Sequence, residues 1–305
     1  MRISQWKKHL WVVLASCLCW WPGAALADAP PAQKLPSALL VFPLIEATGT
    51  RDTRLELLNL SGDPQLVQCF YIAGDTCNEI GFLISLTPYQ PIAWLASAGL
   101  NNTQTGSAAP PFSGQGEMKC AVIPPRPELQ FHNTIQGRAT DFDVVDGTTV
   151  SYGAVAFQRL TDGDFTNVVS LDGVTYAQCP DKLHFDVLAD QPASFSEIIL
   201  APCSEDLLFQ MPATITVQYL ITNEFEQAFS TSKGFTCFDR EALGAVTSQL
   251  TRAILGTDTA HVTVRGSNGP LIGLVIDGVT FAGKNSTAGN EPSFQGGRSA
   301  TLVFP

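Results

Sequence analysis

Ser37-Ala-Leu-Leu-Val-Phe-Pro43 consists of a serine, a short aliphatic run and a terminal proline. The pattern returns as Ser196-Glu-Ile-Ile-Leu-Ala-Pro202 and again as the last residues of the chain, Ser299-Ala-Thr-Leu-Val-Phe-Pro305. Such an aliphatic run is typical of a strand that is buried on both faces. Because proline cannot donate to a strand ladder, each copy predicts a buried strand whose pairing stops at the proline.

A second repeat accompanies this strand. Asp172-Gly-Val-Thr-Tyr176 returns as Asp277-Gly-Val-Thr-Phe281, and each copy precedes a Ser…Pro strand by a similar interval. Chance likeness between Asp-Gly turns is the alternative, but two linked repeats favour duplication of one unit.

The rest of the chain also reads as short strands separated by turn residues, which is typical of β-sandwiches. We therefore expect an all-β protein of two tandem immunoglobulin-like β-sandwich domains, at residues 37–195 and 196–305. At most one short helix is expected, near 240–254, where apolar residues recur at helical spacing. The polar, glycine-rich segments 97–116 and 286–297 are expected to be loops.

The N-terminus has the features of a secretory signal peptide. Basic residues precede an apolar core at 10–21, and Ala25-Leu-Ala27 fits the cleavage pattern. Removal of residues 1–27 would leave a proline-rich, flexible leader at 28–36. A lipoprotein anchored at Cys17 is the alternative. No later segment is apolar enough to span a membrane, so we expect a periplasmic, cell-surface or extracellular protein.

The mature chain would be acidic. The signal peptide holds three of the 17 basic residues and none of the 28 acidic ones, which leaves 14 basic residues against 28 acidic ones. This balance disfavours binding to nucleic acid or anionic lipid.

Six of the eight cysteines remain after residue 27. In an exported chain they indicate disulfides rather than metal ligands or catalytic thiols, and no Cys-x-x-Cys suggests a zinc or redox site. Pairing of neighbours in sequence predicts the bridges Cys69–Cys77, Cys120–Cys179 and Cys203–Cys237.

Motifs for catalysis are weak. The chain contains neither Gly-x-Ser-x-Gly nor His-Glu-x-x-His. His184 and Asp186 would share the polar face of one strand, where the carboxylate could orient an imidazole. A solvated surface pair is the alternative.

Two acidic turns offer clustered oxygens, which suit Ca²⁺. They contain Asp141, Asp143 and Asp146, and then Asp162 and Asp164. Neither turn fits the EF-hand spacing, so a plain solvated turn is the favoured alternative. Calcium is the one cofactor that the sequence suggests.

Tyr89 and Trp94 precede the 97–116 loop and could form an exposed aromatic contact. The alternative, which a lone tryptophan in an apolar strand favours, is a place in the core.

Several phrases together resemble a set of uncharacterised exported β-rich bacterial proteins with paired cysteines. The resemblance implies one co-evolved chain and transfers no activity. It rests on Cys69-Phe-Tyr71, Leu86-Thr-Pro-Tyr-Gln-Pro-Ile-Ala-Trp94, Gly116-Glu-Met-Lys-Cys120, Ala201-Pro-Cys-Ser-Glu-Asp206, Asn223-Glu-Phe-Glu-Gln-Ala-Phe-Ser-Thr-Ser232 and Thr236-Cys-Phe238.

The sequence thus predicts an exported, disulfide-stabilised protein without enzymatic activity. It would bind or assemble with proteins or glycans at the cell surface or in the periplasm. The alternative is a secreted hydrolase of glycans or esters, whose carboxylates and His184 converge only in the fold.

Overall fold

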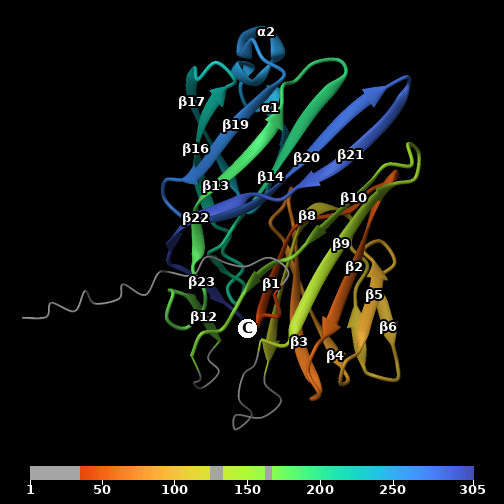
Figure 1. Ribbon diagram of the computed structural model, residues 1–305. Coiled ribbons are helices and arrows are strands. Elements are labelled where there is room, and N and C mark those ends of the chain that lie inside the picture. The colour runs from red at the N-terminus through yellow and green to blue at the C-terminus, as the bar shows by residue number, and fades with distance from the viewer. Residues whose placement is uncertain (1–34, 124–132, 162–166) are drawn as a thin grey trace, which may run out of the picture.

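The computed structural model describes residues 35–123, 133–161 and 167–305, and in this part of the chain the protein is all-β, as predicted (Figure 1). The predicted signal peptide and most of the leader lie outside the described residues. None of the helices described is long and apolar enough to cross a membrane.

The single helix expected near 240–254 is wrong. Two four-residue helices, α1 (Leu243–Val246) and α2 (Arg252–Leu255), flank a 3₁₀ turn at Ser248–Leu250. Thr247 and Thr251 have extended backbones between these pieces, and the Thr247 hydroxyl accepts a hydrogen bond from Gln249 N. Threonine side chains that bond the local backbone compete with helix continuation.

Nine strands from the first half of the chain form one sheet that folds into two layers. The first layer has the order β11-β1-β8-β3-β4 and the second has β10-β9-β2-β5. They join at the pair Ala47↔Asp52. The bounds are β1 Leu39–Ala47, β2 Arg51–Asn59, β3 Gln65–Ala73, β4 Glu79–Leu86, β5 Pro91–Leu95, β8 Gly114–Ile123, β9 Ile135–Asp143, β10 Thr149–Gly153 and β11 Val155–Phe157.

A second pair of sheets lies in the upper part of Figure 1. One has the order β17-β16-β19-β13-β22 and the other β18-β14-β20-β21. The bounds are β13 Cys179–Leu188, β14 Ser194–Pro202, β16 Thr214–Asn223, β17 Ala228–Thr236, β18 Asp239–Ala242, β19 Thr259–Gly266, β20 Leu271–Phe281, β21 Lys284–Asn290 and β22 Ser293–Arg298. Their facing side chains, among them Phe185, Leu200 and Tyr219, form one hydrophobic core.

A small sheet of three strands connects distant parts of the chain. β23 (Ala300–Val303) lies between β12 (Val168–Leu171) and β15 (Glu205–Asp206). The core behind it mixes side chains from both halves, such as Phe70, Phe157 and Phe304. β12 and β13, although they precede residue 196, both pair with strands from the second half. The domain division at 195/196 stays a prediction.

The first copy of the repeated strand, β1, is buried as predicted, whereas the third copy, β23, is not, because it exposes Thr301. All nine residues of β1 are buried, which is why the run is continuously apolar. Its proline differs from the prediction, because pairing with β8 does not stop there. The register shifts between Phe42 and Ile45, around Pro43, and the strand then continues to Ala47. Pro202, by contrast, is the last residue of β14.

The six cysteines form three disulfides, but not between neighbours in sequence. The bridges are Cys69–Cys120, Cys77–Cys237 and Cys179–Cys203. Cys69 lies opposite Cys120 on adjacent strands, whereas Cys77 follows β3 in a turn and reaches a residue 160 positions away. The predicted pairs Cys69–Cys77, Cys120–Cys179 and Cys203–Cys237 are therefore wrong, because sheet neighbours and not sequence neighbours decide the pairing.

Candidate functional site

One polar face of the β17-β16-β19-β13-β22 sheet carries the histidines that the sequence singles out. In β13, Phe185 is buried in the core and its neighbours His184 and Asp186 point to the opposite face, as their alternation predicts. Antiparallel pairing sets His184 opposite Thr263 and Asp186 opposite His261 on β19. The strands therefore gather two imidazoles, a carboxylate and a hydroxyl on one surface.

These side chains form a chain of hydrogen bonds. Asp186 Oδ1 is 3.0 Å from His261 Nδ1, and His261 Nε2 is 3.2 Å from His184 Nδ1. The other nitrogen of His184, Nε2, is 3.0 Å from Gln295 Oε1. Asp186 thus orients an imidazole, as expected, but the ring is that of His261 and not of His184. We call His184 and His261 the histidine pair.

Two residues of this hydrogen-bonded chain, Gln295 and Thr263, were not predicted from the sequence. Gln295 lies in the polar segment 286–297, which was expected to be a loop but contains most of β21 and the first part of β22. The alternation of polar Ser293 and Gln295 with partly buried Phe294 was the available signal. Thr263, whose hydroxyl is 3.1 Å from His184 Nδ1, could be found only through the register of β13 and β19.

A cavity of about 520 Å³ lies beside the histidine pair on the same face. Thr263, Lys182 and Arg265 line one side, and residues of β16 and β17, including Ser230, line the other. Arg265 Nε is 3.1 Å from Asp181 Oδ1, which offsets its charge. The cavity is open to solvent, and both polar and apolar side chains line it.

A larger cavity, about 960 Å³, follows the edge of β4, and we call it the edge groove. β4 ends the order of its sheet, so no strand forms a ladder with its outer side, although Ser107 bonds the backbone of Ser85 there. The opposite wall comes from the hairpin of β6 (Leu100–Asn102) and β7 (Ser107–Ala109) and from residues 207–210. This hairpin corrects the expectation that 97–116 is all loop.

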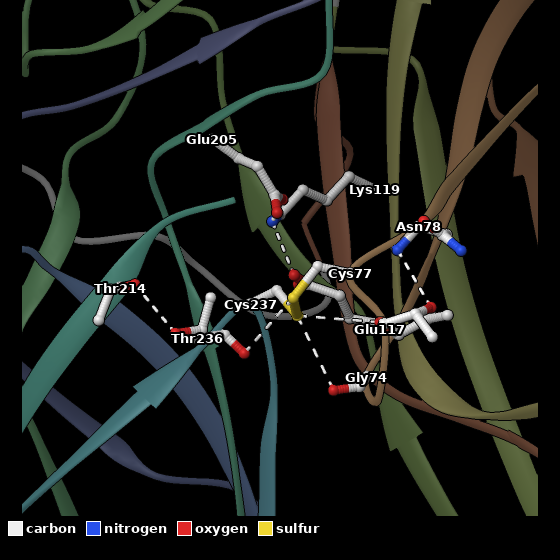
Figure 2. The surroundings of a disulfide bond; sticks show 11 residues. Gly74, Cys77, Asn78, Glu117, Lys119, Glu205, Thr214, Thr236 and Cys237 are labelled. Carbon is white, nitrogen blue, oxygen red and sulfur yellow. Dashed lines mark hydrogen bonds and ion pairs between the residues drawn. A yellow bond between two sulfur atoms is a disulfide. The ribbon is translucent and has the colours of Figure 1, made fainter. Parts of the chain in front are cut away.

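Behind the edge groove lies a buried group of charges, the lysine cluster, which consists of Glu79, Glu117, Lys119 and Glu205. Figure 2 shows Glu117, Lys119 and Glu205. Lys119 Nζ is 2.8 Å from Glu117 Oε1 and also contacts Glu205, and all three side chains are fully buried. Neither carboxylate oxygen of Glu79 has a partner among the described residues. Glu205 comes from β15, so the ion pair ties the first sheet to the small three-stranded sheet.

The lysine cluster has three carboxylates for one ammonium. Burial, with the nearby charge of Glu205, raises the pKa of Glu79 to about 7. Burial also raises the pKa of Glu117 to about 8, although Lys119 opposes it. Burial alone would lower the pKa of Lys119, but its two ion pairs outweigh that effect and raise the pKa. At neutral pH the cluster therefore retains protons that free carboxylates would have lost.

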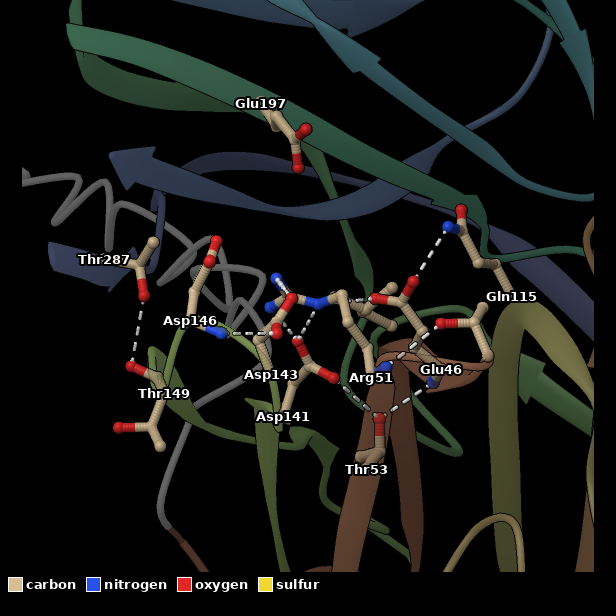
Figure 3. A network of polar contacts seen from close by, with 12 residues as sticks. Glu46, Arg51, Thr53, Gln115, Asp141, Asp143, Asp146, Thr149, Glu197 and Thr287 are labelled. Atoms are coloured by element: carbon tan, nitrogen blue, oxygen red, sulfur yellow. Dashed lines mark hydrogen bonds and ion pairs between the residues drawn. The ribbon is translucent and has the colours of Figure 1, made fainter. Parts of the chain in front are cut away.

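The first acidic turn belongs to a second polar group, the arginine cluster (Figure 3). Arg51 contacts Glu46, Asp141 and Asp143. The remaining members are Arg240, which binds Glu46, and Glu197, which binds Arg240.

Arg51 lies beside Asp141 and Asp143, where the sequence suggested a calcium ion. Asp141 is buried against Arg51, and Asp143 accepts hydrogen bonds from Val145 N and Asp146 N. No group of three or more His, Cys, Asp or Glu side chains is arranged to hold a metal ion in the described ranges. The second turn, with Asp162 and Asp164, lies outside those ranges.

Tyr89 and Trp94 do not form the exposed aromatic contact that was one expectation, because only Tyr89 is exposed. Trp94 is 5% exposed and its Nε1 donates to the Tyr71 hydroxyl at 2.6 Å. Tyr89 is 67% exposed, at a turn with φ 57°. The strand alternation in β5 directs Trp94 into the core, so the alternative favoured by its apolar surroundings is the one observed.

No protein-family model and no curated protein matches the chain. Among solved structures it is similar to Thermotoga maritima 1070, with 8% identity and a TM-score of 0.31 over 39% of this chain and 98% of that one. It is also similar to PNGase F, a glycosylasparaginase from Flavobacterium meningosepticum, with 8% identity and a TM-score of 0.21 over 90% of this chain and 96% of that one. Likenesses this low carry no inference about function.

Proposed function

We propose that this chain is an exported, disulfide-stabilised binding protein without enzymatic activity, which takes up an extended segment of a partner protein along the free edge of β4. The partner segment would add a strand to the sheet, a recognised mode of peptide binding. The observation that carries the proposal is the direction of the backbone groups at Gly81 and Leu83.

Ser85 shows which backbone groups of β4 point away from β3. Its N–H donates to Ser107 Oγ at 2.9 Å, and its carbonyl accepts from that hydroxyl at 2.8 Å. Alternate residues of a strand direct their backbone groups to the same side, so those of Gly81 and Leu83 also point outward. No other described residue bonds these groups, and both residues line the edge groove.

The Cys69–Cys120 disulfide supports the same assignment. Its Cα–Cα distance of 4.1 Å is that of a pair without mutual backbone hydrogen bonds. Cys69 therefore directs its backbone groups toward β4, where it pairs with Phe82. Gly81 and Leu83, on either side of Phe82, must face the groove.

The chemistry of the groove defines the occupant. Exposed edge strands usually carry charge or proline that prevents pairing, but β4 presents Ile80, Gly81 and Leu83, of which Ile80 and Leu83 are 45% and 46% exposed. Glu79 is the one charged side chain among the described residues that line the groove. The fitting partner is an extended segment with alternating apolar residues and no net negative charge, since the chain itself carries a net charge of −11.

Selection from a displayed library of ten-residue peptides tests this proposal. We expect enrichment of alternating apolar sequences that lack acidic residues. Leu83→Pro removes an outward N–H without breaking the ladder to β3 and should weaken the selected peptides at least tenfold in calorimetry. The matched control Leu83→Val retains that N–H and should bind like the wild type. Equal binding by Leu83→Pro, or peptides without alternation, would reject the proposal. Dimerisation that Leu83→Pro abolishes would instead identify a second copy as the occupant.

The secreted hydrolase remains the second candidate, because Thr263, His184 and Gln295 form one chain of hydrogen bonds beside a cavity. A hydroxyl that faces an oriented imidazole can act as a nucleophile. Turnover of a panel of glycoside and ester substrates that Thr263→Ala abolishes would favour this function. No turnover by the wild-type protein would remove it.

Export and domain organisation belong to the same proposal. Signal cleavage should leave Asp28 as the first residue, whereas a lipoprotein would begin at a lipidated Cys17. Mass spectrometry of the mature protein distinguishes the two. The two pairs of facing layers, which enclose the separate core clusters around Leu55 and around Phe185, support tandem immunoglobulin-like sandwiches, although Ile199, Leu274 and Ile276 of the second half also pack into the first cluster.

A further inference from the structure

The histidine pair is held by its outer nitrogens. His261 Nδ1 lies against the Asp186 carboxylate, which can only accept, so that this nitrogen carries a hydrogen. His184 Nε2 lies 3.0 Å from Gln295 Oε1, and with the amide turned so that its oxygen faces the ring, this nitrogen donates as well. Each ring therefore donates outward.

The inner nitrogens are left facing each other as lone pairs. In a neutral imidazole the nitrogen opposite the N–H carries no hydrogen, so His184 Nδ1 and His261 Nε2 are both acceptors, 3.2 Å apart. Thr263 has one hydrogen and can donate it to His184 Nδ1. His261 Nε2 then has no donor among the described residues, and two acceptors in contact need a proton or a metal ion between them.

We propose that the histidine pair binds a divalent transition-metal ion of the zinc or copper type through His184 Nδ1 and His261 Nε2. Imidazole nitrogen is a preferred ligand of these ions. With Zn–N bonds of about 2.0–2.1 Å, a tetrahedral site separates two nitrogens by roughly 3.3 Å, close to the observed 3.2 Å. Water and the Thr263 hydroxyl would complete the coordination.

The surroundings are those of a metal-binding histidine. A ligating imidazole commonly donates its other N–H to a carboxylate or carbonyl, which fixes the ring and raises its basicity, and Asp186 and Gln295 supply both kinds of acceptor. The rings lie 19° from parallel with centroids 5.4 Å apart, so the lone pairs face nearly head-on. A tetrahedral ion needs the two lone pairs to converge at an angle, so the rings must rotate when it enters, which the 46% exposed side chain of His261 can do.

Calorimetric titration of the untagged mature protein with Zn²⁺ tests the proposal, and we expect one ion per chain. His184→Gln and His261→Gln should each abolish binding, while Asp186→Asn, which keeps both ligands, should weaken it by about tenfold. Lys182→Gln, which changes the same face of β13 without touching a ligand, is the matched control and should bind like the wild type. Circular dichroism of each variant verifies the fold.

A spectroscopic readout makes the assignment independent of affinity. Bound Cu²⁺ should show hyperfine coupling to two nitrogens in electron paramagnetic resonance, and neither single variant should give this two-nitrogen spectrum. Absence of metal uptake by the wild-type protein would show that a shared proton alone joins the rings, and would overturn the proposal. Uptake that survives both histidine substitutions would overturn it as well. Neither result bears on the edge groove, so this proposal and the proposed function can fail separately.

Discussion

The lysine cluster and the arginine cluster perform the same structural task with different chemistry. Each joins the two halves of the chain, the first through Lys119 and Glu205 and the second through Arg240 and Glu46. Lys119 has no exposed surface, whereas the Arg240 side chain remains 12% exposed. The lysine cluster offers one cation to three acids, while two guanidinium groups serve the arginine cluster. The stability that the lysine cluster contributes therefore depends on how many of its carboxylates are protonated. The stability that the partly exposed guanidinium groups contribute does not, because they stay charged.

Removal of the lysine is expected to have the largest effect. Lys119→Met leaves Glu117 and Glu205 buried without their cation, and breaking a buried pair in this way costs about 3–5 kcal/mol. Urea unfolding would measure the loss. In the matched variant Lys119→Met/Glu117→Leu/Glu205→Leu, no charge is stranded and most of the stability should return. A loss below about 1 kcal/mol in the single variant would contradict the buried position of this cluster.

The corresponding change in the arginine cluster should cost less. Arg240→Met removes charge-assisted hydrogen bonds to Glu46 and Glu197, but Glu46 keeps its ion pair with Arg51 and Glu197 retains contact with water. We expect a total loss of about 1–2 kcal/mol in urea unfolding. Arg54→Met, in an exposed pair with Glu56, is the control and should change stability by less than about 0.5 kcal/mol. An Arg240→Met loss as large as that of Lys119→Met would abolish the distinction between the clusters.

The pH dependence of stability separates the clusters further. Glu79 and Glu117 have pKa values raised to about 7 and about 8 from the ordinary 4.5. Between these limits the folded protein retains protons that the unfolded chain has released, so stability should fall as pH rises from 5 to 8 and level off above it. Thermal melts at intervals of one pH unit would show this slope.

Glu79→Gln should flatten part of the slope, because it removes one of the retained protons. Arg240→Met should keep the slope intact, since the guanidinium groups stay charged throughout this range. If the wild-type melting temperature rose from pH 5 to pH 8, the raised pKa values in the lysine cluster would be wrong.

Neither cluster was visible in the sequence, although most strands were. Alternation of Ile215, Val217 and Tyr219 predicted β16, because one face of that strand is buried and the other is wet. Glu117 and Lys119 alternate with Met118 and Cys120 in the same manner, which indicates a half-exposed strand. In the fold the polar face of β8 is covered by a second sheet. The alternation of residues along one strand predicts which side chains share a face. It does not predict whether that face is buried, because burial depends on the distant segment that packs against it.

In the candidate sites, too, local alternation was predictable from the sequence and tertiary contacts were not. The polar face of β13 followed from alternation, but the contact between the histidine pair depends on the register of β13 with β19, 77 residues apart. The disulfides failed for this reason also, because Cys77 and Cys237 meet only through tertiary packing. Whether β4 lies at the edge of its sheet depends on the order of all the strands in that sheet, and no local sequence signal carries that information.

Calcium removal is expected to have the smallest effect, and it tests why the arginine cluster contains arginines. The Arg51 guanidinium already neutralises Asp141 and Asp143, so the melting midpoint should be unchanged by EDTA. In Arg51→Gln, buried Asp141 and Glu46 would lose a cation, and a divalent ion could replace it, because carboxylate oxygens are preferred calcium ligands. That variant should be less stable and should gain stability with Ca²⁺ that EDTA reverses. If the wild-type midpoint fell with EDTA and recovered with excess Ca²⁺, the acidic turns would bind calcium as the sequence suggested, and the arginines would accompany the ion rather than replace it.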